Sequence, residues 1–138
     1  MTHERYDVRV IGRVESPLGD REEAPNQGNE GAPEAWLTFE PHVSAAMADL
    51  QVGEDVIVLT WLDRADRNVL QTHPRGDETI PLHGVFSTRS PDRPNPIGLH
   101  RVRILEIAGT RIRVSALEAL DGTPIVDVKP VLDRSLER

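Results

Sequence analysis

The sequence predicts a mainly β fold, a single-domain small β-barrel with one or two short helices. Short segments rich in β-branched residues recur along the chain, Gly/Pro-rich turns separate them, and the clearest pair forms a hairpin around Ala108-Gly109. The 138 residues can bury one core and are too few for two, so we expect one domain over residues 1–138 and no C-terminal extension domain. The chain has no glycine-rich crossover from a strand to a helix, which argues against the doubly wound nucleotide-binding fold.

The N-terminal half predicts two strands, a long loop and a short helix. Apolar and charged residues alternate over residues 8–15, which predicts a first strand that ends before Pro17. Residues 18–33 are acidic and rich in Gly and Pro, and a loop of that length is either a functional lid or disordered. A second strand is expected over residues 35–40. A short helix then begins at Pro41, with an apolar face made of Val43, Ala46, Met47 and Leu50.

The C-terminal half predicts strands throughout. Residues 56–62 are almost continuously apolar, which is typical of a central strand buried on both faces. The other expected strands cover residues 68–73, 85–87, the hairpin of 100–107 with 110–115, and 125–130. In the last of these strands Asp127 and Lys129 should share one face.

Charge is unevenly distributed along the chain. The net charge of −7 counts against a generic nucleic-acid-binding protein. Residues 1–83 hold 16 acidic and 7 basic residues, whereas residues 84–138 hold 7 acidic and 9 basic ones, and six arginines lie between Gly84 and Arg113. The sequence therefore allows a local basic patch and excludes a broad electrostatic footprint.

The composition also bears on compartment and metals. The chain has no Cys, no apolar run of membrane-spanning length and a polar N-terminus. We therefore expect a soluble, cytoplasmic protein that does not associate with a membrane. The five histidines show no spacing typical of metal ligands, so no metal site is predicted.

The most informative stretch is residues 84–99, which read GVFSTRSPDRPNPIGL. Three prolines within six residues exclude a helix or a central strand, because each removes an amide donor and extends the residue before it. The result is a stiff loop, closed by Gly98, that carries Arg89, Arg93 and Asn95. We call residues 88–96 the proline loop. A loop that is ordered before binding suits a ligand site, but it also fits a rigid surface connection or a PxxP segment on which another protein docks.

The second motif, Leu120-Asp121-Gly122-Thr123-Pro124, predicts a tight turn. Asp caps such a turn, Gly supplies the positive φ, and Pro prevents a helix from following. We call residues 120–124 the LDGTP turn. On its own it is most simply a structural hairpin turn.

Together the two motifs resemble those of the TrmO/TsaA-type family of S-adenosylmethionine-dependent methyltransferases. In that family the loop reads roughly G-V-F-A/S-T-R-S-P-x-R-P-N-P-I-G-L and the turn reads L-D-G-T-P. Residues 10–17, VIGRVESP, are similar to the family's opening strand, and Pro74-Arg75 is similar to the Pro-Arg that precedes its loop. The resemblance implies an enzyme that binds S-adenosyl-L-methionine and methylates N6 of the threonylcarbamoyl-adenosine beside a tRNA anticodon. It also implies a homodimer with the cofactor near the interface.

The resemblance implies the site residues as well. An arginine can pair with the methionine carboxylate, and an aspartate can accept from the amine or the ribose hydroxyls. The residues that the resemblance assigns to the cofactor are Pro25, Asn26, Gln27, Asp63, Arg64, Arg89, Leu99, Leu120, Asp121, Gly122 and Thr123.

Catalysis by such a site depends mostly on positioning, because methyl transfer is an in-line displacement. An adenine amine is a poor nucleophile, so an acceptor for its protons helps. The candidates for this role are Asn95 and Asp121, with Asp92 as a third.

The chain also departs from the family pattern, and the departures leave the expected cofactor site in place but leave the methyl acceptor open. Pro25-Asn26-Gln27 lacks an arginine that the family has there, and Asp63-Arg64 stands where the family has His-Glu. Two alternatives therefore stay open, a methyltransferase for a small molecule and a non-catalytic cofactor-binding module.

If tRNA is the acceptor, its phosphates should contact the arginines of the predicted hairpin. Otherwise these arginines neutralise acidic residues of the segment 1–83. The hairpin arginines are Arg101, Arg103, Arg111 and Arg113.

Overall fold

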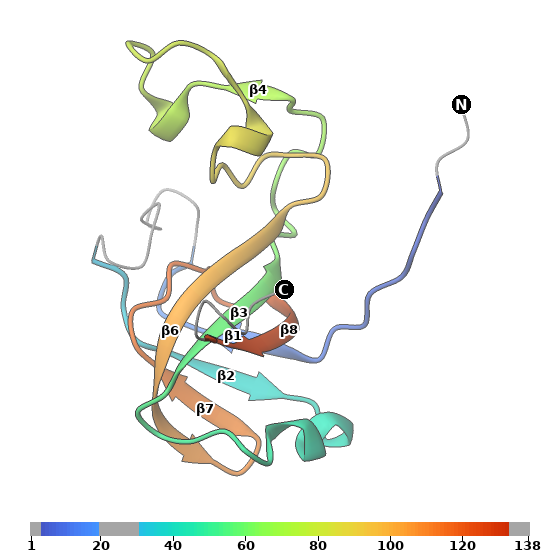
Figure 1. Ribbon diagram of the computed structural model, residues 1–138, viewed down its shortest axis with the longest axis vertical. Coiled ribbons are helices and arrows are strands. Elements are labelled where there is room, and N and C mark those ends of the chain that lie inside the picture. Colours follow the sequence, from blue (N-terminus) through green and yellow to red (C-terminus); the bar gives the residue numbers. More distant parts are fainter. Residues whose placement is uncertain (1–3, 20–30, 133–138) are drawn as a thin grey trace.

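Six antiparallel strands close into one barrel in the computed structural model, which describes residues 4–19 and 31–132 (Figure 1). β8 pairs with β1 and thereby closes the sheet. The mainly β prediction is confirmed. Around the barrel the strands follow the order β1 (Gly12–Glu15), β2 (Ala35–Phe39), β7 (Arg111–Val114), β6 (Ile97–Ala108), β3 (Asp55–Trp61) and β8 (Pro124–Pro130).

Alternate residues of each strand fill the barrel. On β6, for example, Val102 and Ile104 are buried, whereas Arg101 and Arg103 between them are exposed. This follows from the two-residue period of a strand, which turns successive side chains to opposite faces. The buried apolar cluster consists of Val14, Ala35, Leu37, Phe39, Val56, Val58, Val102, Ile104, Ile112, Val114, Leu117, Ala119 and Ile125.

The predicted short helix is the 3-10 helix η2 (Pro41–Met47). Proline at its start fits a helix N-terminus, where an amide donor has no partner to lose. Val43, Met47 and Leu50 pack against one end of the core while staying partly exposed. The helix therefore closes one end of the barrel.

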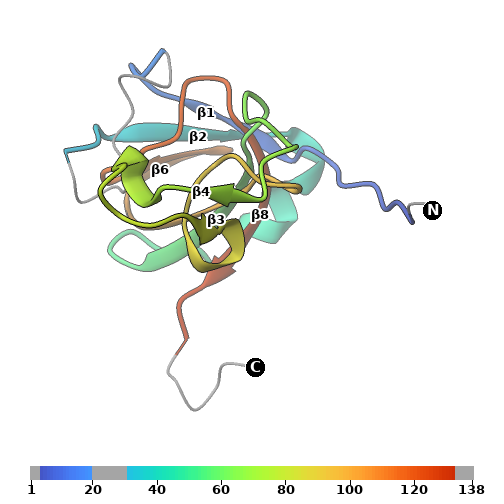
Figure 2. The same ribbon diagram turned by 90° about the horizontal axis from the view of Figure 1, so that it is seen from above.

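Residues 62–96 leave the barrel between β3 and β6 and form a small layer across its other end, which we call the extension (Figure 1, Figure 2). The extension contains a two-stranded sheet of β4 (Gln71–Thr72) and β5 (His83–Gly84). It also contains two single 3-10 turns, η3 (Pro74–Gly76) and η4 (Val85–Ser87).

The first strand is shorter than predicted. β1 starts at Gly12, and residues 8–11 form no strand although their sequence alternates. Only residues 12–15 have β2 beside them, and Tyr6, Val8 and Val10 are exposed. Alternation shows that a segment can form a strand but not that a partner lies alongside.

Two further predictions of strands need correction. β3 is not buried on both faces: Val56, Val58 and Thr60 are buried, and the residues between them are half-buried on the outside of the barrel. Residues 85–87 form η4 rather than a strand, and of residues 68–73 only Gln71–Thr72 pair. A short apolar run does not distinguish a strand buried on both faces from one buried on a single face, nor a strand from a 3-10 turn. A longer segment is needed before the periodicity of the side chains can be recognised.

The expected hairpin and last strand are confirmed. β6 pairs with β7 across a turn at Gly109, whose φ is +63°. β6 begins earlier than predicted, at Ile97, so Gly98 lies within a strand instead of closing the loop. Asp127 and Lys129 share a face of β8 and form an ion pair of 3.2 Å.

No helix in the described ranges is long and apolar enough to cross a membrane.

Candidate functional site

A buried hydrogen-bond network joins three segments that carry predicted site residues. Oγ1 of Thr60 lies 2.7 Å from Nε2 of His100, and Nδ1 of His100 lies 2.5 Å from Oε1 of Glu118. Thr60 is 0% and His100 5% exposed. In sequence, Thr60 precedes Asp63-Arg64, His100 follows the proline loop, and Glu118 precedes the LDGTP turn. The network therefore fixes these segments relative to one another.

Gly98 makes room for this network. A Cβ atom at this position would overlap Oγ1 of Thr60 and lie 2.7 Å from Nε2 of His100. The glycine of the proline-rich motif is thus required by close packing inside the barrel rather than by an unusual φ angle.

The proline loop is held by the turn that follows β3. Two backbone amides and the side chain of Arg67 in this turn donate hydrogen bonds to the loop. The prolines of the loop have no amide hydrogen, so they take part only through their carbonyl oxygens. The contacts are Leu62 N to the Pro96 carbonyl (2.8 Å), Asp66 N to Asp92 Oδ1 (2.9 Å) and Arg67 Nε to the Pro94 carbonyl (2.7 Å). The loop is therefore ordered without a ligand, as expected from its prolines.

The two arginines of the proline loop differ in role. Arg93 donates to the carbonyls of Thr88 and Val85, so its guanidinium holds the loop onto η4. Arg89 is exposed, and no described residue is hydrogen-bonded to its side chain. Of the two guanidinium groups expected to be available, Arg89 is the one that can receive an anionic group.

Asn95 is exposed but its carboxamide oxygen is engaged. Arg67 donates from its second terminal nitrogen to Asn95 Oδ1 at 2.9 Å, and its guanidinium lies 5.1 Å from the ring centroid of Trp61. Asn95 is predicted to accept a proton from the methyl acceptor, and this stays a prediction. Its oxygen accepts one hydrogen bond from Arg67 and keeps a second lone pair, whereas its amide nitrogen is a donor.

The LDGTP turn forms as predicted. Gly122 has a φ of +82°, and the amide of Thr123 donates to the Leu120 carbonyl at 3.1 Å. Asp121 Oδ1 accepts from the amide of Ser16 at 3.0 Å, and no described residue donates to Oδ2. One carboxylate oxygen of Asp121 thus caps the turn, while the other stays available for a ligand. Capping of the turn and contact with the cofactor are therefore compatible roles for Asp121.

Asp121 and Arg64 contact neighbouring parts of the segment that follows β1. The amide of Asp121 donates to the Leu18 carbonyl at 2.8 Å, and Arg64 donates to the Gly19 carbonyl at 2.8 Å. The structure therefore brings Asp63-Arg64 and the LDGTP turn to the same short segment. Pro25, Asn26 and Gln27, also assigned to the cofactor, lie outside the described residues.

Leu99 lies on the outer face of β6, 47% exposed, directly opposite Leu59 of β3. Ile97, two residues earlier on the same face, is 49% exposed. Both are apolar side chains that follow the proline loop and point away from the barrel core. Leu99 is therefore available for contact with a ligand or another chain.

The hairpin arginines are paired with carboxylates. Arg101 and Arg103 both donate to Asp55, at 3.2 Å and 2.9 Å. Hydrogen bonds from both arginines hold the pKa of Asp55 below its usual value, and the bond from Arg103 has the larger effect. Arg111 pairs with Glu15 and lies over Trp36, and Arg113 pairs with Glu106 and Glu34.

These pairs bear on the two roles that the sequence left open for the hairpin arginines. Asp55, Glu15 and Glu34 all belong to residues 1–83, whose acidic excess the arginines partly neutralise. The hairpin therefore does not present four unpaired cations to a phosphate backbone.

Sequence reasoning missed four residues that organise this region: Thr60, His100, Glu118 and Arg67. His100 occupies an inward position of β6, where the alternation otherwise has only small or apolar residues. A histidine at a core position is a detectable sign of a buried polar network. For Arg67 the sequence offers no comparable sign, because it is one charged residue in a polar turn.

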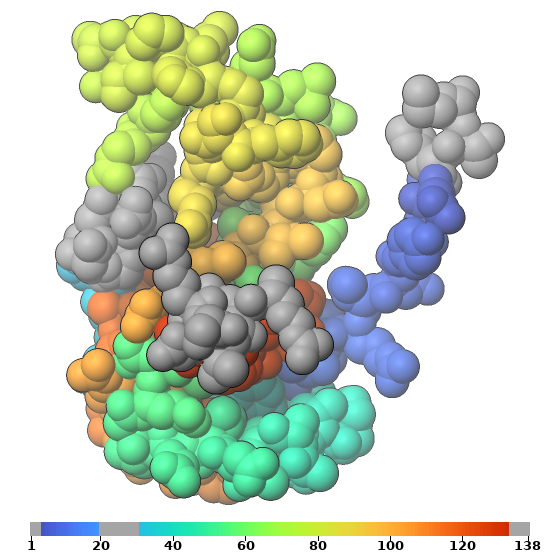
Figure 3. Space-filling model, in the orientation of Figure 1, coloured from blue at the N-terminus to red at the C-terminus, as the bar shows by residue number. Residues whose placement is uncertain are grey.

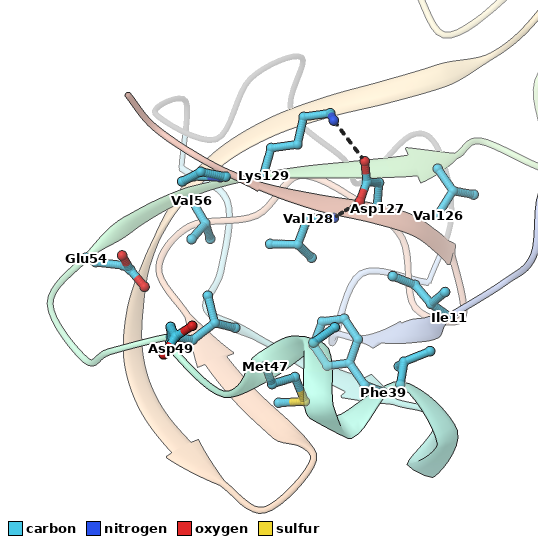
Figure 4. Close-up of a pocket in the computed structure, with 14 residues that line it drawn as sticks. Ile11, Phe39, Met47, Asp49, Glu54, Val56, Val126, Asp127, Val128 and Lys129 are labelled. Atoms are coloured by element: carbon cyan, nitrogen blue, oxygen red, sulfur yellow. Dashed lines mark hydrogen bonds and ion pairs between the residues drawn. The ribbon is translucent and has the colours of Figure 1, made fainter. Parts of the chain in front are cut away.

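A separate cavity of about 490 Å³ lies at the opposite end of the barrel (Figure 4). It is lined by apolar side chains of η2 and β8, with Asp49, Glu54 and Lys129 among its polar residues. Of the residues predicted for the cofactor, none of those that the structure describes lines it. Among the described residues, no three His, Asp or Glu side chains cluster as metal ligands.

Comparison with known proteins decides the family. The family model described as tRNA-methyltransferase O N-terminal domain matches residues 13–135. The chain belongs to this family. All the site residues predicted above lie within the matched range.

Curated proteins share much of this chain's sequence. A probable S-adenosyl-L-methionine-binding protein of Methanothermobacter thermautotrophicus is 44% identical over 123 residues, which cover 89% of this chain and 88% of the relative. An S-adenosyl-L-methionine-binding protein of Archaeoglobus fulgidus is 38% identical, with 88% and 86% covered.

Solved structures of the family have the same fold. Two crystal structures of TrmO from Pseudomonas aeruginosa match with TM-scores of 0.74 and 0.73, at 27% and 28% identity. The matches cover 99% and 96% of this chain, which spans only 61% and 57% of the solved chains.

Proposed function

We propose that this protein is an S-adenosyl-L-methionine-dependent methyltransferase that modifies tRNA. The observation that carries the proposal is the family match, which extends over residues 13–135 and includes the proline loop and the LDGTP turn. The relatives named as S-adenosyl-L-methionine-binding proteins support the choice of cofactor.

The residues present fit this cofactor. Arg89 offers an exposed guanidinium for the methionine carboxylate, and Asp121 Oδ2 is available for the amine or a ribose hydroxyl. Leu99 and Leu120 provide apolar surface for the adenine. The cofactor would supply a methyl group activated by its positive sulfur.

The chain's own contribution is rigid positioning. The contacts of Arg67, Asp66 and Leu62 hold the proline loop, and the buried network of His100 fixes it relative to the LDGTP turn. An ordered site holds the reacting atoms close without a further entropic cost on binding. With the Asn95 oxygen held by Arg67, Asp121 is the better-placed acceptor for a proton of the substrate amine, and Asn95 can orient the substrate through its amide nitrogen.

For the acceptor we propose N6 of threonylcarbamoyl-adenosine beside the tRNA anticodon, as the sequence resemblance implies. We also propose a homodimer with the cofactor near the interface. Because this chain spans less than two thirds of the TrmO chains, the acceptor and the assembly need direct tests. Arg89, which no described residue pairs, is available to a phosphate if the methionine carboxylate is bound elsewhere.

A non-catalytic cofactor-binding role is the second candidate. It is favoured by the names of the curated relatives, which mention binding of S-adenosyl-L-methionine and no transfer.

One experiment separates these functions. The purified protein is titrated with S-adenosyl-L-methionine by calorimetry and then incubated with cofactor and tRNA that carries threonylcarbamoyl-adenosine. Cofactor binding with a mass gain of one methyl on that nucleoside is the expected result. Binding without methylated nucleoside would refute the tRNA acceptor, and absence of binding would refute both candidates.

A further inference from the structure

β3 and β6 carry apolar side chains on the outside of the barrel, where an antiparallel sheet in contact with water has polar ones. The register of the two strands places Trp61 opposite Ile97 and Leu59 opposite Leu99. Ile97 and Leu99 are 49% and 47% exposed, and Trp61 and Leu59 are half-buried. Ile57 follows on the same outer side of β3. We call these five residues, Ile57, Leu59, Trp61, Ile97 and Leu99, the apolar face.

A charged cluster and the extension border the apolar face at its two ends. At one end, Asp55 of β3 pairs with Arg101 and Arg103 of β6, at 3.2 Å and 2.9 Å. At the other end the chain passes from β3 into the extension, which stands above the barrel in the space-filling view (Figure 1, Figure 3). An apolar centre with charges at its rim is the composition of a protein–protein interface.

The shape and the charge of the apolar face fit a protein better than a nucleic acid. None of its five residues lines the 490 Å³ cavity or a hollow of about 200 Å³ on the extension. The arginines at its charged end are paired with Asp55, so a phosphate backbone would have to compete with that carboxylate. A contiguous apolar surface on a sheet marks a site of protein contact.

The described N-terminal segment of the same chain does not cover the apolar face. Residues 4–10 lead into β1, whose neighbours in the barrel are β2 and β8 and neither β3 nor β6. Figures 1 and 2 show this segment extending away from the barrel. Arg67 lies over the ring of Trp61 at 5.1 Å, but Ile97 and Leu99 beside it stay half exposed.

A second copy of the chain matches the apolar face in its arrangement and in its position. A twofold axis through the apolar half would place apolar side chains on apolar side chains and leave both charged ends at the rim, as in an isologous interface. Leu99, which the family resemblance assigns to the cofactor, belongs to this face. A dimer built on it therefore has the cofactor near its interface.

We propose that two copies of this chain associate through their apolar faces, and that each partner closes one side of the other's cofactor site at Leu99. The inference rests on the homodimer proposed above and assigns its surface. The sheets pack face to face, and the side chains of the two apolar faces interdigitate between them.

Sedimentation and light scattering of two single variants test this surface. Ile97→Asp places a carboxylate in the centre of the interface and should raise the dissociation constant of the dimer at least tenfold. The matched control is Val52→Asp, because Val52 is an apolar residue 61% exposed that precedes the charged end of β3. It should change the dissociation constant less than twofold. Thermal unfolding checks that both variants are folded. Equal effects of the two substitutions, or a natural protein that is monomeric at every concentration, would refute the proposal.

Spin labels locate the contact independently, since the natural chain has no Cys to react with them. A label on Ile97→Cys should show dipolar broadening from the partner's label, and a label on Val52→Cys should not. Broadening at Val52 alone would mean that the dimer uses another surface, which would overturn the inference. Calorimetry with S-adenosyl-L-methionine separates this result from the proposed function: a dimer through the apolar face that binds no cofactor would support the surface and refute the activity.

Discussion

Nδ1 of His100 lies 2.5 Å from Oε1 of Glu118, and the other ring nitrogen lies 2.7 Å from Oγ1 of Thr60. A carboxylate can only accept, so Nδ1 carries a hydrogen, and in the neutral ring Nε2 then accepts from the Thr60 hydroxyl. The pair connects β6 to the segment that leads into the LDGTP turn. A short polar contact inside the barrel thus determines how two surface motifs lie relative to each other.

Replacing Glu118→Ala should destabilise the protein and weaken cofactor binding. The substitution removes a charge-assisted hydrogen bond and leaves the 5%-exposed His100 without its partner, which should cost about 1.5–3 kcal/mol of unfolding free energy. Urea unfolding and calorimetric titration with S-adenosyl-L-methionine measure the two effects. As a control, the exposed Glu40→Ala should change stability by less than about 0.5 kcal/mol. Equal losses in both variants would mean that the network carries no special role.

Gly98→Ala should be strongly destabilising although it adds one methyl group. The new Cβ would overlap Oγ1 of Thr60 and lie 2.7 Å from Nε2 of His100, and overpacking of this kind costs about 1–3 kcal/mol or more. Gly84→Ala is a matched control, because a Cβ there meets nothing within 4 Å. Thermal unfolding of both variants checks the prediction. A Gly98→Ala protein as stable as the control would show that the network can move aside.

Arg89→Ala should weaken cofactor binding without affecting the fold. Arg89 makes no hydrogen bond with a described residue, so its removal leaves no partner unsatisfied, whereas a charge-assisted contact to the cofactor would be worth about 1.5–3 kcal/mol. Calorimetry should therefore show a dissociation constant raised about 10- to 100-fold at unchanged unfolding free energy. Arg9→Ala, another exposed arginine, provides the control. Unchanged affinity in the folded variant would remove Arg89 from the site.

The sequence predicted the fold more completely than the site, and the residues show why. Alternation and turn residues are local properties, so the hairpin around Gly109 and the LDGTP turn could be predicted with their main residues. The role of Gly98 depends on Thr60, which is 38 residues away, and that of Asn95 on Arg67, which is 28 residues away. Contacts between distant residues follow from the closed barrel and have no local pattern. The same holds for the arginines of β6, whose partner Asp55 comes from β3.

Asp55 should make stability depend on acid pH. Hydrogen bonds from Arg103 and then Arg101 lower its pKa in the folded protein, so the carboxylate contributes stability above its unfolded pKa and loses it as the pH falls through the folded value. The contribution is small, about 1 kcal/mol or less, because both arginines are well exposed. Asp55→Asn should therefore be less stable than the natural protein at pH 7 and approach it below about pH 4. Urea unfolding at several pH values measures this, and a difference that is constant with pH would contradict it.

Arg67→Ala should impair the reaction more than cofactor binding. Arg67 holds the carbonyl of Pro94 at 2.7 Å and Oδ1 of Asn95 at 2.9 Å, and it lies over Trp61. Without it, the Asn95 carboxamide is free to rotate, and the proline loop keeps only the backbone contacts of Leu62 and Asp66 with the turn after β3. Positioning errors of this kind act on the transition state, so kcat should fall at least tenfold while the dissociation constant of the cofactor changes less than threefold.

Two further variants make the Arg67 prediction specific. Arg67→Lys keeps the charge but cannot donate to both acceptors from one planar group, so it should lose most of the activity as well. Asn95→Ala should lower kcat by a similar factor, and the double variant Arg67→Ala/Asn95→Ala should be no worse than either single one, because both changes remove the same oriented group. Additive losses in the double variant would mean that Arg67 acts through the loop backbone and not through Asn95.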